Sequence, residues 1–254
     1  MLTIAVLNQK GGVGKTTTAV NLGAYLARGG KSVLLVDLDP QANATSGLGV
    51  DKQNLDSTMY DALFQHQEAP NIIRDTLVSG LKLLPSNANL AGAEVQLVDT
   101  LQRELQLKLM LEQFNYDISL IDCPPSLGLL TVNALSAADY VLIPVQTEYY
   151  ALEGLSQLLA VIQRVKDALN PKLEILGVLL TMFDSRTSLS DQVMDEVKKH
   201  FGDKVFETII PRNVRLAEAP SFGQPISEHD KWSKGAKAYK QLSKEVLKRI
   251  EGGK

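Results

Sequence analysis

Nine residues near the start of the chain have the composition of a phosphate-binding loop. Residues 9–17 read Q-K-G-G-V-G-K-T-T, and they follow a short apolar run at 3–7. Glycines lack a Cβ atom, so their backbone N–H groups can turn inward around an anion. A lysine in such a loop reaches the β- and γ-phosphates of a nucleotide, and the hydroxyl that follows it binds Mg²⁺. The pattern predicts a nucleotide site between a strand and a helix whose positive end faces the phosphates.

Contacts within this loop can be predicted residue by residue. Lys15 is expected to contact the phosphates and Thr16 to bind the metal ion. The loop departs from the standard G-x-x-x-x-G-K-[ST] pattern, because position 9 is Gln and a second lysine, Lys10, precedes the paired glycines. A monomer could bind ATP without Lys10, so this residue has no evident role within one chain. The other loop residues expected to surround ATP are Gly11, Gly12, Val13, Gly14 and Thr17.

Two further strand-like runs end in carboxylates. Residues 32–36 lead to Asp37 and Asp39, and residues 118–121 lead to Asp122. The carboxyl ends of parallel strands meet in the crevice where such sheets bind ligands. Mg²⁺ keeps several waters and takes only one or two carboxylates, so Asp39 and Asp122 are candidates to hold it through water. Asp39 is also the candidate for orienting the attacking water, whereas each Asp has capping of a turn or helix as its alternative role.

Strand-like and helical segments alternate along the chain. Alternation of this kind, with strands that are apolar on both faces, predicts an α/β fold in which helices flank both faces of a mostly parallel twisted sheet. No linker or low-complexity stretch interrupts it, so we expect a single domain over residues 1–254. Residues 41–80 are less regular, with one short helix expected at 60–64. The expected strands are 3–8, 33–37, 81–85, 117–122, 140–145, 175–181 and 205–209, and the expected helices are 15–29, 93–115, 127–136, 152–169, 189–201 and 233–250.

Composition and charge narrow the class of protein. No apolar stretch approaches the roughly 20 residues needed to cross a bilayer. The single cysteine, Cys123, excludes an internal disulfide, so we expect a cytoplasmic protein. We also expect no signal peptide, because the first strand begins at once. Cys123 is expected to pack behind Asp122. The net charge is −3, yet residues 186–254 carry 14 Lys/Arg against 10 Asp/Glu, a net of +4. A basic carboxyl-terminal third is compatible with DNA binding.

Several motifs together resemble a known family. K-G-G-V-G-K-T-T, V-D-L-D-P-Q and I-D-C-P-P-S, in this order, resemble the deviant Walker ATPases of the ParA/MinD superfamily. Q-A-N-A-T-S-G-L-G, residues 144–154 and residues 211–220 resemble the chromosomal ParA (Soj) branch more closely, and the resemblance covers residues 2 to 250. It implies an ATPase that uses ATP and Mg²⁺, with Lys10, Lys15 and Asp39 as the catalytic set. It also implies that Lys10 reaches the partner's phosphates in an ATP-bound sandwich homodimer.

The resemblance implies further sites. It places the adenine near Pro211 and Asn213, with an ordinary strand-to-loop turn as the alternative. It places Arg186 and Arg215 against DNA phosphates without base readout, with ion pairs inside the fold as the alternative. The implied function is chromosome or plasmid partitioning by a nucleoid-associated dimer that binds double-stranded DNA non-specifically. Hydrolysis is expected to be slow without DNA and a ParB/Spo0J-type centromere-binding partner, since no arginine finger is evident in the chain.

Other classes share parts of this pattern. A MinD-like membrane-associated cell-division ATPase has the same first motif, but it would end in an amphipathic membrane-targeting helix. Residues 248–254 lack the bulky apolar residues that would insert, so we expect no stable membrane anchoring. A nitrogenase-type iron protein needs two cysteine ligands per subunit, which Cys123 alone cannot supply. A small-molecule ligase or kinase on the same scaffold stays open.

Overall fold

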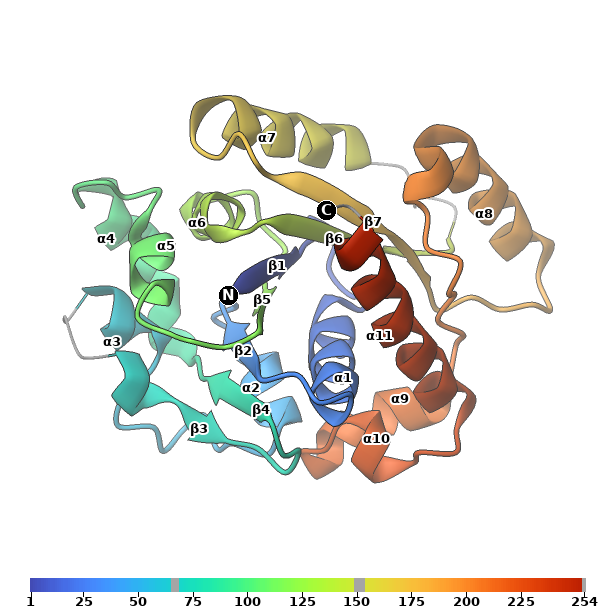
Figure 1. Cartoon of the computed structure of the whole chain (residues 1–254), viewed down its shortest axis with the longest axis horizontal. Coiled ribbons are helices and arrows are strands. Elements are labelled where there is room, and N and C mark those ends of the chain that lie inside the picture. The colour runs from blue at the N-terminus through green and yellow to red at the C-terminus, as the bar shows by residue number, and fades with distance from the viewer. Residues whose placement is uncertain (65–68, 149–153, 253–254) are drawn as a thin grey trace.

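A seven-stranded sheet forms the centre of the molecule, which is known from a computed structural model describing residues 1–64, 69–148 and 154–252 (Figure 1). The strand order is β3-β4-β2-β5-β1-β6-β7, and all neighbouring pairs are parallel except β3 and β4. The predicted α/β fold class is therefore confirmed. The strands are β1 (Leu2–Val6), β2 (Val33–Asp37), β3 (Arg74–Asp75), β4 (Leu81–Leu84), β5 (Ile118–Asp122), β6 (Tyr140–Gln146) and β7 (Glu174–Thr181).

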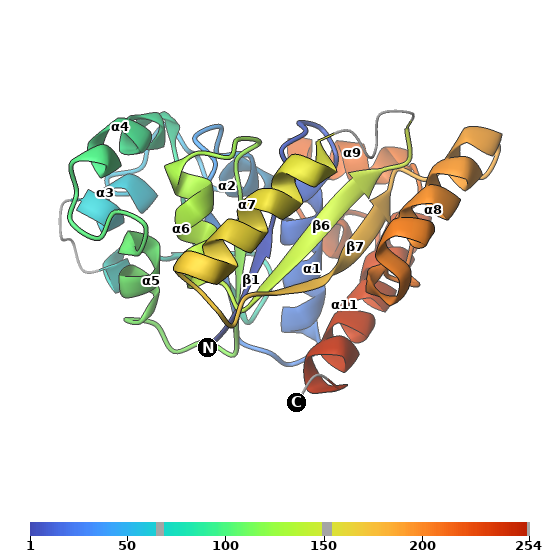
Figure 2. The same ribbon diagram turned by 90° about the horizontal axis from the view of Figure 1, so that it is seen from above.

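Helices cover both faces of the sheet (Figures 1 and 2). Along β1, Ile4 and Val6 pack on one face, whereas Ala5 and Leu7 pack on the other, because successive side chains of a strand point in opposite directions. Burial on both faces explains why the strands are continuously apolar. The first face is covered by α1 (Lys15–Arg28), α2 (Asn43–Gly47), α9 (Val214–Glu218), α10 (Ile226–His229) and α11 (Lys234–Gly252), and the second by α3 (Met59–Phe64), α4 (Ala93–Val98), α5 (Gln106–Leu111), α6 (Leu129–Ala137), α7 (Leu155–Ala168) and α8 (Ser188–Phe201).

The sheet register brings the expected carboxylates together. Asp37 at the end of β2 is paired with Asp122 at the end of β5. Asp122 is also the register partner of Val6, the last residue of β1. The loop that leaves β1 therefore starts beside both acidic strand ends.

The helix predicted at 93–115 is wrong as a single element. α4 ends at Val98, and α5 begins only at Gln106. Gln102, between them, has a φ of 53°, which is outside the right-handed helical region. The Arg103 guanidinium donates a hydrogen bond to the Val98 carbonyl at 3.1 Å. This contact satisfies an acceptor at the open end of α4 and stabilises the break.

The strand predicted at 205–209 is also wrong. This segment meets β7 at one isolated bridge, between Val205 and Val178, and the Phe206 N–H donates to the Val178 carbonyl at 2.9 Å. The backbone N–H groups of Glu207 and Thr208 donate instead to the Glu245 carboxylate on α11, at 2.8 and 2.9 Å. Because a side chain takes these two donors, they are not available to a strand ladder.

The other predicted elements are present with ends displaced by a few residues, including the short helix at 60–64. Residues 149–153 lie outside the described residues. They belong to the 144–154 motif, and the last two are the first residues of the helix predicted at 152–169. The short elements β3, α2, α9 and α10 have no counterpart among the predicted ones. Across the described ranges, no helix combines the length and apolar character needed to span a bilayer.

Candidate functional site

The glycine-rich loop turns at the carboxyl end of β1 and opens α1. Gly12 and Gly14 have φ angles of 74° and 89°, in the left-handed region that favours glycine. The Thr181 hydroxyl donates to the Val13 carbonyl at 2.8 Å, and the Val13 side chain is buried. Val13 thus anchors the loop to β7. The loop itself lies at the positive end of α1, the arrangement that binds phosphate.

A pocket of about 470 Å³ lies in front of the loop. The structure brings most predicted nucleotide residues into its wall. The segment after β2 and the loop after β7 add residues whose role the sequence did not indicate, among them Asn43, Ser46 and Met182. The predicted residues that line the pocket are Gly11, Gly12, Gly14, Lys15, Thr16, Thr17 and Asp39.

A second pocket, of about 320 Å³, adjoins the first. The two share Gly14, Thr17 and Met182 in their walls. Both residues predicted for the adenine, Pro211 and Asn213, line the second pocket. The Asn213 Oδ1 accepts a hydrogen bond from a backbone N–H at 3.2 Å and caps α9, so the Nδ2 group is the one available to donate to a ligand.

Lys15 is held at the floor of the phosphate pocket. Its side chain is almost fully buried, and Nζ donates to the Lys10 carbonyl at 2.9 Å. Burial lowers the pKa of Lys15, and the nearby carboxylates of Asp122 and Asp39 oppose that shift. A buried cation beside two acids is well placed to bind phosphate together with a metal ion.

Asp122 is the most unusual group of the site. It is fully buried, and neither carboxylate oxygen has a hydrogen-bond partner within the described ranges. Burial raises the pKa of Asp122 well above its usual range, and the neighbouring Asp37 carboxylate raises it further. The Thr16 hydroxyl and Lys15 lower this pKa in part, although Thr16 makes no hydrogen bond of regular geometry to either oxygen. An unsatisfied buried carboxylate next to a threonine fits a divalent cation held through water.

The described part of the chain has no group of three or more His, Cys, Asp or Glu side chains placed to hold a metal ion. Mg²⁺ does not need such a group, because it keeps most of its waters and draws its remaining ligands from phosphates and one or two protein groups. Thr16 and Asp39 in the wall, with Asp122 behind them, provide such a set.

Asp37 and Asp39 have different roles despite their spacing. Asp37 is buried and accepts hydrogen bonds from the Asp39 N–H at 3.2 Å and from the Thr45 N–H and hydroxyl at 2.8 and 2.7 Å. It therefore fixes the turn into α2. Asp39 faces the pocket, and its Oδ1 accepts from the Gln41 N–H at 2.9 Å. Among the described contacts its Oδ2 has no hydrogen bond, so that oxygen can accept from water.

Lys10 does not line its own phosphate pocket. It lies in a neighbouring hollow, with Nζ 4.0 Å from Oε2 of Glu148. The other oxygen of Glu148 lies 3.8 Å from Nη2 of Arg212, which lines the second pocket. Glu148 thus connects the loop lysine with the segment near Asn213. Glu148 belongs to the 144–154 motif, and its sequence pattern gave no sign of this role.

Arg186 and Arg215 lie outside both pockets, and both are ion-paired. Arg186 makes a two-point contact with Asp184, with N–O distances of 2.8 and 2.6 Å. Arg215 donates to Glu218 at 2.9 Å, and its Nε lies 3.6 Å from a carboxylate oxygen of Asp230. Both ion pairs lie at the surface, with 83% of the Arg186 side chain and 57% of the Arg215 side chain exposed.

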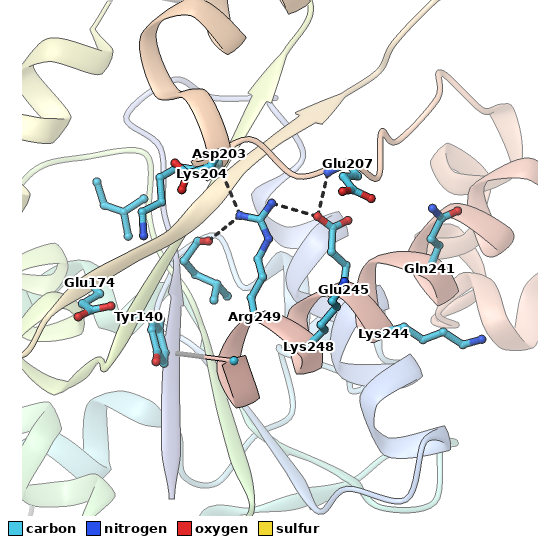
Figure 3. Close-up of a pocket in the computed structure, with 13 residues that line it drawn as sticks. Tyr140, Glu174, Asp203, Lys204, Glu207, Gln241, Lys244, Glu245, Lys248 and Arg249 are labelled. Carbon is cyan, nitrogen blue, oxygen red and sulfur yellow. Dashed lines mark hydrogen bonds and ion pairs between the residues drawn. The ribbon is translucent and has the colours of Figure 1, made fainter. Parts of the chain in front are cut away.

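A larger pocket, of about 570 Å³, lies at the opposite end of the sheet between α11 and the start of β7 (Figure 3). It contains none of the predicted site residues. Arg249 reaches across it and donates to the carbonyls of Leu176, Lys204 and Val205 and to Glu245, at 2.7 to 3.2 Å. The Arg249 guanidinium is thus fully bonded inside the fold, and these bonds connect α11 to the sheet.

The chain matches the AAA domain family over residues 1–175. It is 60% identical to the sporulation initiation inhibitor protein Soj of Bacillus subtilis, over 96% of this chain and 97% of Soj. It is 53% identical to the chromosome partitioning protein ParA of Myxococcus xanthus, over 97% of this chain and 88% of that protein. Among solved structures, it resembles the cobyrinic acid a,c-diamide synthase of Mycobacterium smegmatis with bound ADP and magnesium, with a TM-score of 0.89, 39% identity and coverage of 100% and 97%. It also resembles the cell-division ATPase MinD of Pyrococcus furiosus, with a TM-score of 0.78, 26% identity and coverage of 97% and 98%.

Proposed function

We propose that this chain, which belongs to the Soj/ParA family of chromosome-partitioning ATPases, is an ATP-controlled DNA-binding switch. It is an ATPase of chromosome or plasmid partitioning, and it uses ATP and Mg²⁺. To this we add an ATP-bound sandwich homodimer, non-specific binding of that dimer to double-stranded DNA, and release on hydrolysis stimulated by a ParB/Spo0J-type partner. The observation that carries the proposal is a complete phosphate pocket with one loop lysine, Lys10, outside it.

The two adjoining pockets divide the nucleotide between them. The glycine N–H groups, Lys15 and the positive end of α1 hold the phosphates. The second pocket accepts the adenine, with Asn213 Nδ2 able to donate to a ring nitrogen. The shared wall at Gly14 and Thr17 then lies along the ribose and the first phosphate.

Few groups act on the bond that is cleaved. Bound Mg²⁺ neutralises charge on the phosphate oxygens, and Thr16, Asp39 and Asp122 are the residues that would hold it. Asp39 orients the attacking water through the carboxylate oxygen that has no described hydrogen bond. With positioning as the main contribution and no arginine finger from the same chain assigned, intrinsic turnover is slow.

Lys10 supplies a cation to a second copy of the chain. Two ATP molecules in one interface bring concentrated negative charge, which opposes association unless cations face it from both sides. Lys10 is partly exposed and weakly held by Glu148 at 4.0 Å, so it is free to reach outward. ATP then favours the dimer because it binds the dimer more tightly than the separate chains.

The dimer binds DNA through phosphate contacts. Arg186 and Arg215 from two chains would neutralise four phosphates, which corresponds to a slope of log K against log salt of roughly −3.6. Monomers make half these contacts and bind weakly. ATP thereby controls residence on the nucleoid by doubling the number of contacts.

The testing experiment is binding of the purified protein to a random-sequence duplex, with ATP, with ADP and without nucleotide, across a salt series. We expect tight, salt-sensitive, sequence-indifferent binding with ATP only. Binding that ignores the nucleotide, or no binding at all, would contradict the switch. Turnover that requires a small acceptor and ignores DNA would favour the kind of activity named for the Mycobacterium smegmatis protein instead.

Lys10→Ala separates the dimer from the nucleotide site. This variant should bind ATP as the unmodified chain does but should neither dimerise nor bind DNA with ATP. Sedimentation with and without ATP measures the first effect, and the duplex titration measures the second. Normal ATP-dependent dimerisation of the variant would remove the role given to Lys10.

A further inference from the structure

We infer that Asp184, Glu218 and Asp230 compete with DNA phosphate for Arg186 and Arg215 and so set the strength of DNA binding. This inference rests on the DNA binding proposed above. It assigns a function to three acidic residues that belong neither to the nucleotide pockets nor to the DNA contacts themselves. Their charges lower the affinity for a polyanion that the two arginines would otherwise have.

The Asp184 carboxylate covers the face of Arg186 that would bind phosphate. The guanidinium meets both carboxylate oxygens, Nε at 2.8 Å and Nη2 at 2.6 Å, which is the same two-point geometry that arginine uses for phosphate. The Arg186 pairing lowers the pKa of Asp184 far below its usual range, so the carboxylate is charged at any physiological pH. A phosphate at this position must therefore displace a carboxylate.

Of the two partners, Asp184 is the fixed one. Its side chain is 21% exposed, whereas that of Arg186 is 83% exposed. The Arg186 N–H donates to Asp184 Oδ1 at 3.1 Å, and the Thr187 N–H donates to the Asp184 carbonyl at 3.1 Å. Arg186 can swing toward DNA, but Asp184 stays at the base of the loop. The acid then remains close enough to repel an incoming phosphate.

Arg215 faces two carboxylates. Glu218 accepts its hydrogen bond at 2.9 Å, and Asp230 lies 3.6 Å from its Nε. Asp230 is also fixed, because its Oδ1 accepts from the Trp232 N–H at 3.1 Å. His229 Nε2 lies 3.8 Å from Glu218 in the same group. One arginine facing two carboxylates leaves Arg215, Glu218 and Asp230 with a net charge of −1.

The backbone joins the two paired arginines into one surface. The Phe183 N–H donates to the Ile210 carbonyl at 3.0 Å, and the Arg212 N–H donates to the Phe183 carbonyl at 2.9 Å. Asp184 and Asn213 follow directly on these two bonded segments. Arg186, in the loop after β7, and Arg215, at the start of α9, thus follow two bonded segments and would meet the same stretch of duplex.

Exposed ion pairs of this kind are weak, which makes the competition reversible. Release of one such carboxylate should tighten DNA binding by about two- to fivefold for each arginine. It should also steepen the salt dependence, because a displaced carboxylate takes up a cation when the arginine transfers to phosphate, and this offsets part of the counterion release. Weak individual contacts would explain why two chains are needed for stable binding.

Amide substitutions remove the charge and keep the local hydrogen bonds. Asp184→Asn and Asp230→Asn retain an oxygen that can accept the same backbone N–H, and asparagine favours such turns. Glu218→Gln completes the set. Asp75→Asn is the matched control, since Asp75 is an exposed acid that pairs with Lys82. Asp75 lies on β3, at the opposite edge of the sheet from β7.

Two measurements test the inference. The first is fluorescence anisotropy of a random-sequence duplex titrated with ATP-loaded protein at several salt concentrations. The second needs no DNA: the rate at which phenylglyoxal modifies Arg186 and Arg215, followed by peptide mass spectrometry. We expect each amide variant to bind the duplex more tightly than the control variant and its own arginine to be modified faster.

Several results would overturn the inference. Affinity gains no larger than that of Asp75→Asn would show a general charge effect only. Unchanged modification rates would show that the carboxylates do not hold the arginines in solution. If the unmodified chain binds no DNA in any nucleotide state, the proposed function fails. In that case, DNA binding gained by Asp184→Asn but not by Asp75→Asn would still support competition between Asp184 and phosphate for Arg186. No gain of binding by Asp184→Asn would overturn the inference as well.

Discussion

Pockets of similar size lie at the two ends of the sheet. They differ in how the buried charged groups beside them are bonded. At the carboxyl ends of the strands, a pocket of about 470 Å³ adjoins Asp122, whose buried oxygens have no described hydrogen-bond partner. At the other end, a pocket of about 570 Å³ surrounds Arg249, which is bonded to three carbonyls and to Glu245. The central cation of the larger pocket, Arg249, is thus fully paired, whereas the acid beside the smaller pocket, Asp122, has no described hydrogen-bond partner.

This difference indicates which pocket is built for a ligand. A buried charge without a partner costs free energy of folding, and functional sites are where such groups are kept. A charge with all its partners stabilises the fold and gains little from a ligand. The state of the charged groups therefore points to the glycine-rich loop as the ligand site.

The largest effect is expected from Lys15→Ala. Loss of the buried cation should weaken ATP binding or turnover roughly a hundredfold or more, since a preorganised charge in a dry site is lost. Titration with a fluorescent ATP analogue measures this effect. Lys244→Ala removes the same charge from the larger pocket and should leave ATP binding unchanged. Similar losses in both variants would erase the contrast between the pockets.

Arg249→Ala should act on stability instead. We expect the free energy of unfolding to fall by about 2–3 kcal/mol, because three carbonyls lose a donor and Glu245 loses its cation. Urea unfolding followed by circular dichroism measures the change, with the exposed neighbour Lys248→Ala as the control. ATP affinity of the folded variant should stay normal. A stable variant that binds ATP poorly would make the larger pocket functional.

Asp122→Asn should reveal the conflict between stability and function. Mg²⁺-dependent turnover should fall roughly tenfold or more, as for other groups that support a metal site. The raised pKa of Asp122 means that the folded chain holds this proton above pH 4, where the unfolded chain releases it. Stability of the unmodified chain without nucleotide should therefore fall as pH rises from about 4 through that raised pKa.

The variant should show a smaller decline, because burial also raises the pKa of Asp37, to about 6, and it should be more stable at neutral pH. Urea midpoints measured between pH 4 and pH 8 compare the two proteins. A variant less stable than the unmodified chain at every pH would show that Asp122 stabilises the fold in its charged form.

The smallest effect is expected from Glu148→Gln. Glu148 lies 4.0 Å from Lys10 and 3.8 Å from Arg212, so its neutral form should release Lys10. Because exposed pairs are weak, ATP-dependent self-association should strengthen by about twofold. Sedimentation equilibrium measures it, and Glu174→Gln in the larger pocket is the control. Weaker self-association would instead place Glu148 in the subunit interface.

The nucleotide loop could be predicted from the sequence because its determinants are local. Gly12, Gly14, Lys15 and Thr16 lie within five residues, and the strand and helix that flank them have clear apolar patterns. The carboxyl-end rule for parallel sheets also placed Asp39 and Asp122 near the loop. Alternation along the strand gave Asp37 and Asp39 the same side, but it could not show that Thr45 binds Asp37.

The parts that the sequence did not predict depend on partners far along the chain. The segment 205–209 is not a strand because Glu245, 38 residues after Glu207, takes its N–H groups. The break at Gln102 depends on a left-handed backbone conformation that no glycine signals. Likewise, the ion pair of Arg215 with Asp230 comes from the packing of α9 against the end of α10.

The backbone bridge between Phe183 and the 210–212 segment has a consequence for how information passes through the molecule. One side of the bridge leads to Arg186, and the other forms the wall of the second pocket. Because main-chain hydrogen bonds make the connection, side-chain substitutions in either loop leave it in place. If ATP tightens DNA binding by some factor, thermodynamic linkage requires that DNA tighten ATP binding by the same factor. The nucleotide pocket would then report on the DNA surface as well as control it.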